Sequence, residues 1–354
     1  MIDFLTFSDG RDHLVFEADR PLGAISGRVL SPTKNIGCSE SVLFSRAANG
    51  VSFRPFALSI SNARLSLENR HIVDASCHLI RNDRIDWQAG PDPEEEFIHF
   101  SRDPQKCRHF YLPGKTLYLD SVWGHSFFHF ISETLGKVYV SSLFLGLENY
   151  DNVIVPSPVA RFVADWFGLL GISNACIIPS GCRYDNILAE SLVLPSYSQH
   201  CGWLSRELID FVKLNLGDAL SPISAEDELK IVVGRRGKRQ ILNQDEIMAK
   251  AASRGFSLVY LEDLSVLQQA KLFASACCVI APHGAGLTNL IYCRPGTRVF
   301  EFFGRSYQNA CFYGICGLIG LSHAYHISDS CEDGDGSFCV KPEVLDIYFS
   351  EFVS

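Results

Sequence analysis

The stretch CCVIAPHGAGLTNLIYCRPGTRVFEFF, residues 277–303, decides the expected fold of this chain. It begins with an unbroken apolar run, breaks at Pro282, His283 and two glycines, turns apolar again and ends in a second apolar run. Short apolar runs bounded by turn residues indicate buried strands. The stretch therefore predicts a strand, a glycine loop, a helix and a second strand.

The same alternation of strands and helices precedes this stretch. We predict strands at residues 230–236 and 257–262, and helices that begin near Asn243 and Ser265. Asn243 and the glutamate three residues later have the spacing of a capping box. Because strands that alternate with helices form parallel sheets, we expect residues 225–330 to form a doubly wound, Rossmann-like α/β domain.

The rest of the chain is expected to form a second, acceptor-side domain. Residues 1–118 alternate short apolar stretches with turn residues, which predicts a β-rich portion, and the proline-rich acidic segment 90–97 within it predicts a solvated loop. Residues 119–218 combine helical periodicity with short strands and predict an α/β region. We expect the polar segment 217–228 to be a linker and residues 331–354 to form a tail helix that packs back.

The composition excludes several classes of protein. The 354 residues, 47% of them hydrophobic, are enough for two domains with their own cores. A net charge of -9 argues against nucleic acid as a partner, because nucleic-acid binding needs a basic face. The chain has no apolar run long enough to span a membrane, no secretory pattern at its start and an odd number of cysteines, 13. Together these features predict a cytoplasmic protein with reduced thiols.

The glycine loop is a candidate phosphate site. Ligands of open α/β sheets bind beyond the carboxyl ends of the strands, where His283, Gly284, Ala285 and Gly286 are expected to lie. Glycine lets the backbone approach a ligand closely, and the start of the helix that follows favours phosphate. His283 could donate a hydrogen bond to a diphosphate. The alternative is a tight turn that carries a half-exposed histidine.

Charged residues end two other strands of the same predicted sheet. The densest positive cluster of this acidic chain follows the first strand: Arg235, Arg236, Lys238 and Arg239. Because the guanidinium fork fits a diphosphate, we expect Arg235 and Arg239 to be functional and the other two to be merely exposed. Glu301 ends the strand after the glycine loop, where a carboxylate would meet the hydroxyls of a ribose.

Other enzyme patterns fit this sequence less well. No Walker loop occurs, and Asn289 stands where a dinucleotide fingerprint would have its third glycine. The run from Gly124 to Ser126 resembles the start of a hydrolase nucleophile elbow, but Phe128 replaces the final glycine of that motif.

The segment YLDSVWGHSFFHFISETLGK, residues 118–137, carries polar groups on an aromatic helix. His125, His129 and Glu133 are spaced by four residues, which places them along one side of a helix. Such a stripe can supply a general base, with Asp120 as a less favoured one; histidines satisfied within an aromatic core are the alternative. The glutamate of the H-E-x-x-H zinc motif is missing, so we expect no metal.

Four segments together resemble the glycosyltransferases of family 61, a family related to plant xylosyltransferases and to the EGF-domain-specific and protein-O-mannose N-acetylglucosaminyltransferases. The segments are FFHFISETLGK, GRRGKRQILNQDEI, GFSLVYLEDLSVLQQAKLFASA and HGAGLTNLIYCRPGTRVFEFF. The run HGAGLTN is specific to the pattern, whereas Gly234 replaces a serine and Gln268 replaces the usual glutamate. The first 115 residues show no recognisable motif, so the resemblance does not identify an acceptor.

This resemblance implies a GT-B-like fold, in which two Rossmann-like domains face each other across a cleft. It also implies a nucleotide-sugar donor, inversion at the anomeric carbon and no essential metal. On this basis the catalytic candidates are His129, Glu133, His125 and Asp120. The residues expected to bind the donor nucleotide are Arg235, Arg239, His283, Gly284, Ala285, Gly286, Leu287, Asn289 and Glu301.

The predicted function is an inverting, metal-independent glycosyltransferase that moves a sugar from a UDP-sugar to a hydroxyl acceptor in polysaccharide or glycoconjugate synthesis. The acceptor is expected to be a glycan or a lipid-linked glycan. A non-catalytic nucleotide- or glycan-binding module and an NAD-dependent Rossmann enzyme are the alternatives. The sequence leaves open a peripheral association with the inner face of the membrane and a homodimer.

Overall fold

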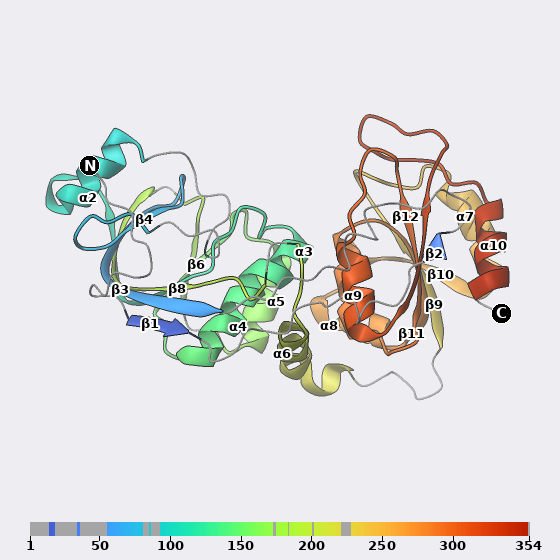
Figure 1. Ribbon diagram of the computed structural model, residues 1–354, viewed down its shortest axis with the longest axis horizontal. Helices are drawn as coiled ribbons and strands as arrows, with labels where there is room; N and C mark the ends of the chain where they lie inside the picture. Colours follow the sequence, from blue (N-terminus) through green and yellow to red (C-terminus); the bar gives the residue numbers. More distant parts are fainter. Residues whose placement is uncertain are drawn as a thin grey trace. The chain divides into compact units, whose positions relative to one another are not determined.

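The protein divides into two compact units (Figure 1). Unit 1 comprises residues 1–23 and 52–211, and unit 2 comprises residues 24–51 and 212–354. The structure, a computed structural model, describes residues 14–17, 34–35, 55–80, 85, 93–172, 175–182, 184–199, 202–220 and 228–352. Most of the predicted linker, residues 221–227, lies outside the described residues.

Unit 2 is built on a parallel sheet with the strand order β10-β9-β11-β12-β13-β2. Its strands are β2 (Lys34–Asn35), β9 (Leu229–Gly234), β10 (Phe256–Tyr260), β11 (Ala276–Pro282), β12 (Arg298–Phe303) and β13 (Ser322–Ile327). The five strands from β9 onward follow the order 2-1-3-4-5, which is one of the doubly wound orders. The sheet is therefore consistent with the predicted Rossmann-like domain.

Helices cover both faces of this sheet (Figure 1). They are α7 (Gln244–Ala252), η4 (Leu261–Asp263), α8 (Val266–Ala274), η5 (Ala285–Tyr292), α9 (Cys311–Ile319) and α10 (Glu343–Phe352). Ser265 caps α8 as predicted, in a capping box with Gln268. Asn243 opens α7 as predicted, but its side chain makes no capping bond to the helix backbone and bonds to Glu246 and Val340 instead.

The tail helix α10 packs on the sheet of unit 2. Its Leu345, Tyr348 and Phe349 belong to a buried cluster that includes Ile280 of β11 and Phe300 of β12. The rings of Tyr348 and Phe300 stack with their centroids 4.3 Å apart. Burial of aromatic side chains of this size is a major source of stability, so α10 is part of the core of unit 2.

Unit 1 is built on a mixed sheet with the order β1-β3-β8-β5-β6-β7, and β4 pairs with β3. Its strands are β1 (Leu14–Glu17), β3 (Phe56–Ser66), β4 (His71–Val73), β5 (Phe110–Tyr118), β6 (Asn152–Val155), β7 (Cys176–Pro179) and β8 (Asn186–Pro195). Strand β3 is antiparallel to β1, β4 and β8, whereas β5 to β8 are parallel to one another. The predicted β-rich and α/β regions therefore share one sheet.

The helices of unit 1 depart from the expected pattern in two places. They are α2 (Glu95–Arg102), η1 (Pro104–Lys106), α3 (Phe127–His129), the π-helical turn η2 (Phe130–Thr134), α4 (Leu135–Phe144), α5 (Arg161–Leu169) and α6 (Arg206–Leu216), which η3 (Gly217–Leu220) follows. The segment 90–97 was predicted as a solvated loop, but its last residues, from Glu95, form the start of α2. This helix buries Phe97 and Phe100. The helix expected within residues 118–137 begins at Phe127 and contains a π turn.

Two further observations concern the class of the protein. Among the described residues, no helix combines the length and the apolar character that a membrane crossing requires. Cys331 and Cys339 form a disulfide, so the prediction that the cysteines are reduced is wrong for this pair. The sequence missed the bond because pairing cannot be deduced from spacing alone.

Candidate functional site

The strand order of unit 2 reverses between β9 and β11, and the predicted ligand residues lie at that point. Arg235 follows the carboxyl end of β9, and His283 follows the carboxyl end of β11. A pocket there is lined by Arg235, Gly284 and Gly286 together with Glu262. A reversal of strand order is where doubly wound sheets bind their ligands, so the structure brings the arginine and glycine motifs together at a suitable edge.

Gly284 lets the side chain of Arg235 pack against the glycine loop. Its φ of 171° is extended, so the backbone does not require glycine for its conformation. A Cβ atom built on Gly284 would instead lie 1.6 Å from Nη1 of Arg235. Because glycine has no side chain, the guanidinium group can lie directly over the loop. Its Nε donates a hydrogen bond to the carbonyl of Lys238 at 2.5 Å, which fixes the direction of the side chain.

The four cations of the arginine cluster have different surroundings. Arg236 is exposed and binds both carboxylate oxygens of Asp263 at 2.7 and 2.8 Å, and Lys238 lies 3.9 Å from Asp335. Within the part of the chain that the structure describes, Arg235 and Arg239 form no ion pair with a carboxylate. Burial first, and then the positive charge of Arg239, lower the pKa of Arg235, although the nearby carboxylate of Glu262 opposes them. An anion bound here would relieve that repulsion.

The ring of Tyr307 lies against both Arg239 and His283. The guanidinium carbon of Arg239 lies 4.7 Å from the centre of the Tyr307 ring, a cation–π distance. The ring of His283 lies 5.4 Å from the same ring. Tyr307 is 46% exposed, so this aromatic side chain lies at the surface beside the two predicted ligand groups.

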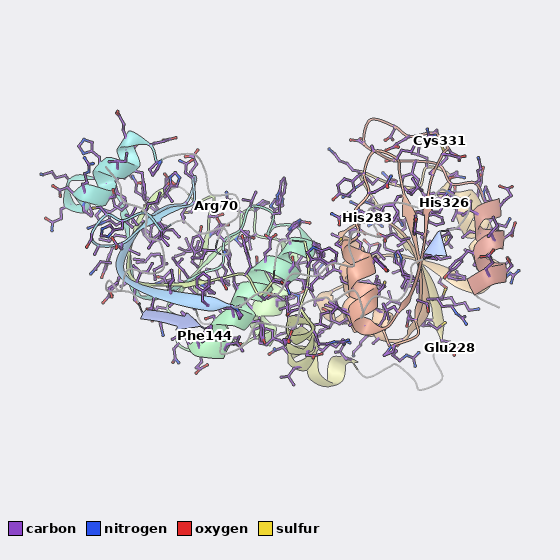
Figure 2. All side chains as sticks on the ribbon, viewed as in Figure 1. Arg70, Phe144, Glu228, His283, His326 and Cys331 are labelled. Carbon is purple, nitrogen blue, oxygen red and sulfur yellow. A yellow bond between two sulfur atoms is a disulfide. The ribbon has the colours of Figure 1, made fainter. Side chains whose placement is uncertain are left out.

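His283 is oriented by a buried carboxylate. Its Nδ1 lies 2.5 Å from Oε1 of Glu301, and Nε2 of His323 lies 3.0 Å from Oε2 of the same side chain. Glu301 is 0% exposed. Burial raises its pKa, but the two imidazoles outweigh burial and hold the pKa of Glu301 below its ordinary value. Such a contact to a carboxylate fixes the orientation of an imidazole. Figure 2 labels His283 beside the sheet of unit 2.

Three other predicted ligand residues make contacts within the protein, and their roles toward a nucleotide stay predictions. Both oxygens of Glu301 contact histidines, so this carboxylate orients His283. Asn289 is buried and donates to Gln269 and to the carbonyl of Gly286. Leu287 lines the pocket beside Arg235. It lies in η5, which is a 3-10 helix and not the expected α-helix.

In unit 1 the histidine segment follows β5, at the point where the strand order of that sheet reverses between β8 and β5. Nδ1 of His129 lies 2.7 Å from Oε1 of Glu133. The side chain of His129 is 26% exposed and that of Glu133 is 2% exposed. Glu133 lies in the π turn, and π turns inside helices occur frequently at functional sites. The pair therefore presents an imidazole that a buried carboxylate orients.

The predicted three-residue stripe is only partly present. His125 precedes the helix, because α3 begins at Phe127. Its Nδ1 is buried without a hydrogen-bond partner among the described residues. Trp123 is 45% exposed, and its ring lies 6.1 Å from that of His125 and 6.4 Å from that of His129. His125 thus shares an aromatic surface with His129, without belonging to the helix.

Asp120 is enclosed by cationic side chains. It is buried, and its Oδ2 accepts a hydrogen bond from Nε of Arg70 at 3.1 Å. Nζ of the buried Lys137 donates to its carbonyl oxygen at 2.5 Å. This geometry makes Asp120 a structural neighbour of the histidine segment and a poorer candidate for a base. Among the described residues, no group of three His, Cys, Asp or Glu side chains could hold a metal ion.

Sequence reasoning missed two residues of the site. His323 lies on β13, a strand that was not predicted because SHAYHI (322–327) does not alternate apolar and polar residues. Tyr307 lies in the loop after β12 and carries no recognisable motif. Its role depends on Arg239 and His283, which are distant in sequence and both lie against its ring.

Comparisons with known proteins match the region of the chain that contains these sites. The model of the family described as Glycosyltransferase 61 matches residues 127–300, which include His129, Glu133, Arg235, Arg239 and His283. Beta-1,2-xylosyltransferase XYXT1 of Oryza sativa subsp. japonica is 38% identical over 63 residues, 18% of this chain and 14% of that protein. A beta-1,2-xylosyltransferase of Arabidopsis thaliana is 34% identical over 79 residues, 22% of this chain and 15% of that protein. The chain thus spans a small part of the length of these relatives.

Proposed function

This chain belongs to glycosyltransferase family 61, and from that premise we propose that it is an inverting, metal-independent glycosyltransferase. The donor is a UDP-sugar, and the acceptor is the hydroxyl group of a glycan or lipid-linked glycan. Because both relatives are named as xylosyltransferases, UDP-xylose is the first donor to test. The GT-B-like arrangement expected from the resemblance is part of this proposal.

The donor diphosphate binds where the strand order of unit 2 reverses, between β9 and β11. Arg235 and Arg239 supply two positive charges that form no ion pair with a carboxylate among the described residues. Gly284 leaves room for the guanidinium group of Arg235. Fixed guanidinium groups can neutralise a departing diphosphate in the place of a divalent ion. His283, held by Glu301, directs a ring N–H or lone pair toward the same ligand.

His129 is the general base, and Glu133 orients it. The oxygen of the acceptor hydroxyl attacks the anomeric carbon, its proton passes to Nε2 of His129, and the bond from the anomeric carbon to the diphosphate oxygen breaks. Nδ1 of His129 already contacts Glu133, so Nε2 is the nitrogen left for this transfer. The buried carboxylate stabilises the imidazolium that forms.

The observation that carries the proposal is the placement of Arg235 over Gly284 where the strand order of unit 2 reverses, inside the region that the family matches. A thermal-shift screen with UDP, UDP-sugars, GDP-mannose and NAD tests it. We expect stabilisation by UDP and UDP-sugars, and transfer from a UDP-sugar that persists in a chelator of divalent ions. Stabilisation by NAD alone would support the nicotinamide alternative. UDP binding without transfer to any acceptor would support a binding module.

The predicted cytoplasmic localisation stays a prediction. Disulfides such as Cys331–Cys339 occur mostly in oxidising compartments, which argues for such a compartment. Fractionation of cells that express the tagged full-length protein would decide between the two, and would show any peripheral attachment to membranes.

A further inference from the structure

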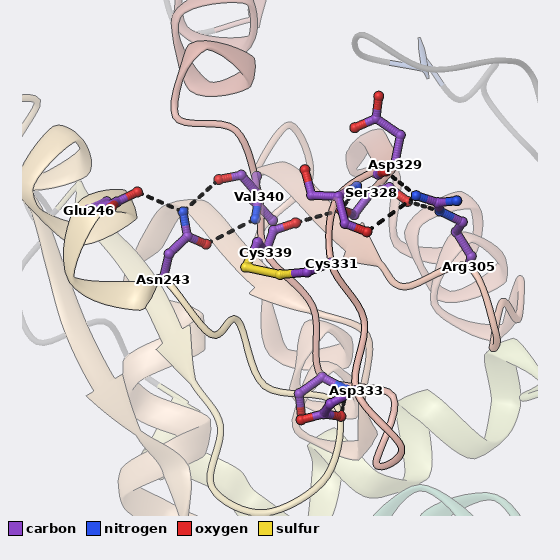
Figure 3. Close-up of a disulfide and its surroundings, with 11 residues drawn as sticks. Asn243, Glu246, Arg305, Ser328, Asp329, Cys331, Asp333, Cys339 and Val340 are labelled. Atoms are coloured by element: carbon purple, nitrogen blue, oxygen red, sulfur yellow. Dashed lines mark hydrogen bonds between the residues drawn. A yellow bond between two sulfur atoms is a disulfide. The ribbon is translucent and has the colours of Figure 1, made fainter.

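Residues 331–339 form a short loop that the Cys331–Cys339 disulfide closes (Figure 3). We call it the disulfide loop. Asp333 organises its interior, since Oδ1 accepts hydrogen bonds from the backbone N–H groups of Asp335 at 2.9 Å and Ser337 at 2.8 Å. The backbone N–H of Asp333 also donates to the carbonyl of Ser337 at 2.8 Å. The loop is therefore a defined structure that can hold what packs against it.

The disulfide loop is bonded to the backbone of the arginine cluster. The N–H of Arg239 donates to the carbonyl of Asp335 at 3.2 Å, and the N–H of Gln240 donates to the hydroxyl of Ser337 at 3.2 Å. The N–H of Phe338 in turn donates to the carbonyl of Gln240 at 2.9 Å. The position of Arg239 thus depends on the conformation of the disulfide loop.

Arg239 has a backbone conformation that needs such support. Its φ of 60° lies in the left-handed region, which residues with a side chain seldom occupy. Conformations of this kind persist where the surroundings determine them, and they gather at ligand sites. Without the bond to Asp335 we expect Arg239 to relax to a more favourable φ, which would redirect its guanidinium group.

The same loop holds the segment that carries Tyr307. Glu332 accepts hydrogen bonds from the backbone N–H groups of Arg305 at 2.8 Å and of Ser306, and from the Ser306 hydroxyl. Gly336 lies between the two held segments, since a Cβ atom built there would be in ordinary van der Waals contact with both, 3.4 Å from Cγ of Arg239 and 3.4 Å from Oγ of Ser306. One loop therefore supports both the cation and the aromatic ring that contacts it.

The carboxyl end of the disulfide loop is anchored independently of the disulfide. Asn243 bonds to the N–H and the carbonyl of Val340, and Ser328 donates to the carbonyl of Cys339 at 2.5 Å (Figure 3). Phe338 is buried in the core of unit 2. Breaking the disulfide is therefore expected to loosen the part of the loop around Asp335 and to leave the fold of unit 2 in place.

We propose that the disulfide loop is the positioning element of the donor site, so that affinity for a nucleoside diphosphate depends on the Cys331–Cys339 bond. This inference rests on the function proposed above. A dithiol reductant breaks the S–S bond, supplies two electrons and two protons, and is itself oxidised to a disulfide, which leaves two thiols on the protein. Loosening then releases Arg239 and Tyr307 from their places beside His283.

The test is the dissociation constant of UDP, measured by calorimetry on the full-length protein in its oxidised and dithiol-reduced forms. We expect UDP binding to weaken by on the order of tenfold on reduction, because that is the effect of losing one charge-assisted hydrogen bond. The variant Cys331→Ser/Cys339→Ser should bind as weakly as the reduced protein and should not respond to the dithiol. That insensitivity is the control for the other cysteines of the chain.

A second pair of measurements separates positioning from a general loss of structure. In the variant Arg239→Gln, reduction should change the UDP dissociation constant by less than about twofold, because the group that the loop positions is already gone. A full tenfold effect in that background would overturn the inference. Equal UDP affinity of the oxidised and reduced wild type would overturn it while leaving the proposed function intact. Failure of the oxidised wild type to bind UDP would overturn both.

Discussion

Two histidine–carboxylate pairs lie at the reversal points of the two sheets, and they differ in what surrounds the carboxylate. In unit 2, Glu301 is 0% exposed and contacts both His283 and His323. In unit 1, Glu133 orients a single imidazole, His129, whose side chain is 26% exposed. The first pair is enclosed in aromatic surroundings, and the second presents its imidazole at the surface beside Trp123.

This difference indicates two different tasks. An imidazole fixed inside an aromatic wall suits a constant hydrogen bond to a ligand, whereas proton transfer requires access for the reacting group. The arginine cluster supports the same division of tasks. Arg235 packs against Gly284, the residue after His283, and Arg239 lies over the ring of Tyr307 in the same unit. We therefore assign ligand binding to the pair in unit 2 and proton transfer to the pair in unit 1.

The largest effect is expected for His129→Ala. Removing a general base typically lowers turnover by about 10²- to 10⁴-fold, and the UDP dissociation constant should stay unchanged because the donor site is elsewhere. Glu133→Gln should lower turnover as well, since the imidazole loses the carboxylate that orients it. Both are measured by single-turnover transfer from a UDP-sugar. Normal turnover in His129→Ala would remove His129 from this role.

Next in size is the effect of Glu301→Gln on stability. Removing one partner of a buried hydrogen bond to a charged group typically costs about 1–3 kcal/mol, and chemical denaturation measures this difference. The pKa of Glu301 is lowered in the folded state, so its contribution is present above the ordinary value of 4.5 and is lost as the pH falls through the folded pKa. The difference in the free energy of unfolding between wild type and variant should therefore decrease below pH 4.5. A difference that is independent of pH would contradict an ionised Glu301.

Arg235→Ala should have a smaller effect, confined to ligand binding. Loss of a charge-assisted contact to the diphosphate is expected to weaken UDP binding by about tenfold to a hundredfold. Arg236→Ala is the matched control, because that side chain is exposed and already paired with Asp263. If the two variants weaken UDP binding equally, the cluster acts only through its total charge.

The smallest effect is expected for Trp123→Ala. Its ring shares a surface with His125 and His129 without bonding to either. An exposed aromatic ring beside the base would contact a sugar acceptor, so we expect the KM for the acceptor to rise about threefold to tenfold while the KM for the UDP-sugar stays constant. Steady-state kinetics with each substrate varied in turn would check this, and a change confined to the donor would contradict it.

The sequence predicts the edge of the sheet better than the directions of the side chains on it. Arg235 and His283 could be placed together because the carboxyl ends of parallel strands share an edge. The roles of Glu301 and Asn289 could not be predicted, because their partners His323 and Gln269 come from β13 and α8. Similarly, the position of His125 depends on where the helix begins, and helix ends are poorly fixed by periodicity.

The two histidines are expected to perform separable tasks, and the UDP dissociation constants of His129→Ala and His283→Ala, measured side by side, test this most directly. We predict that His129→Ala binds UDP like the wild type and that His283→Ala binds it about tenfold more weakly. Equal UDP affinity in the two variants, whether both weakened or both unchanged, would contradict the assignment.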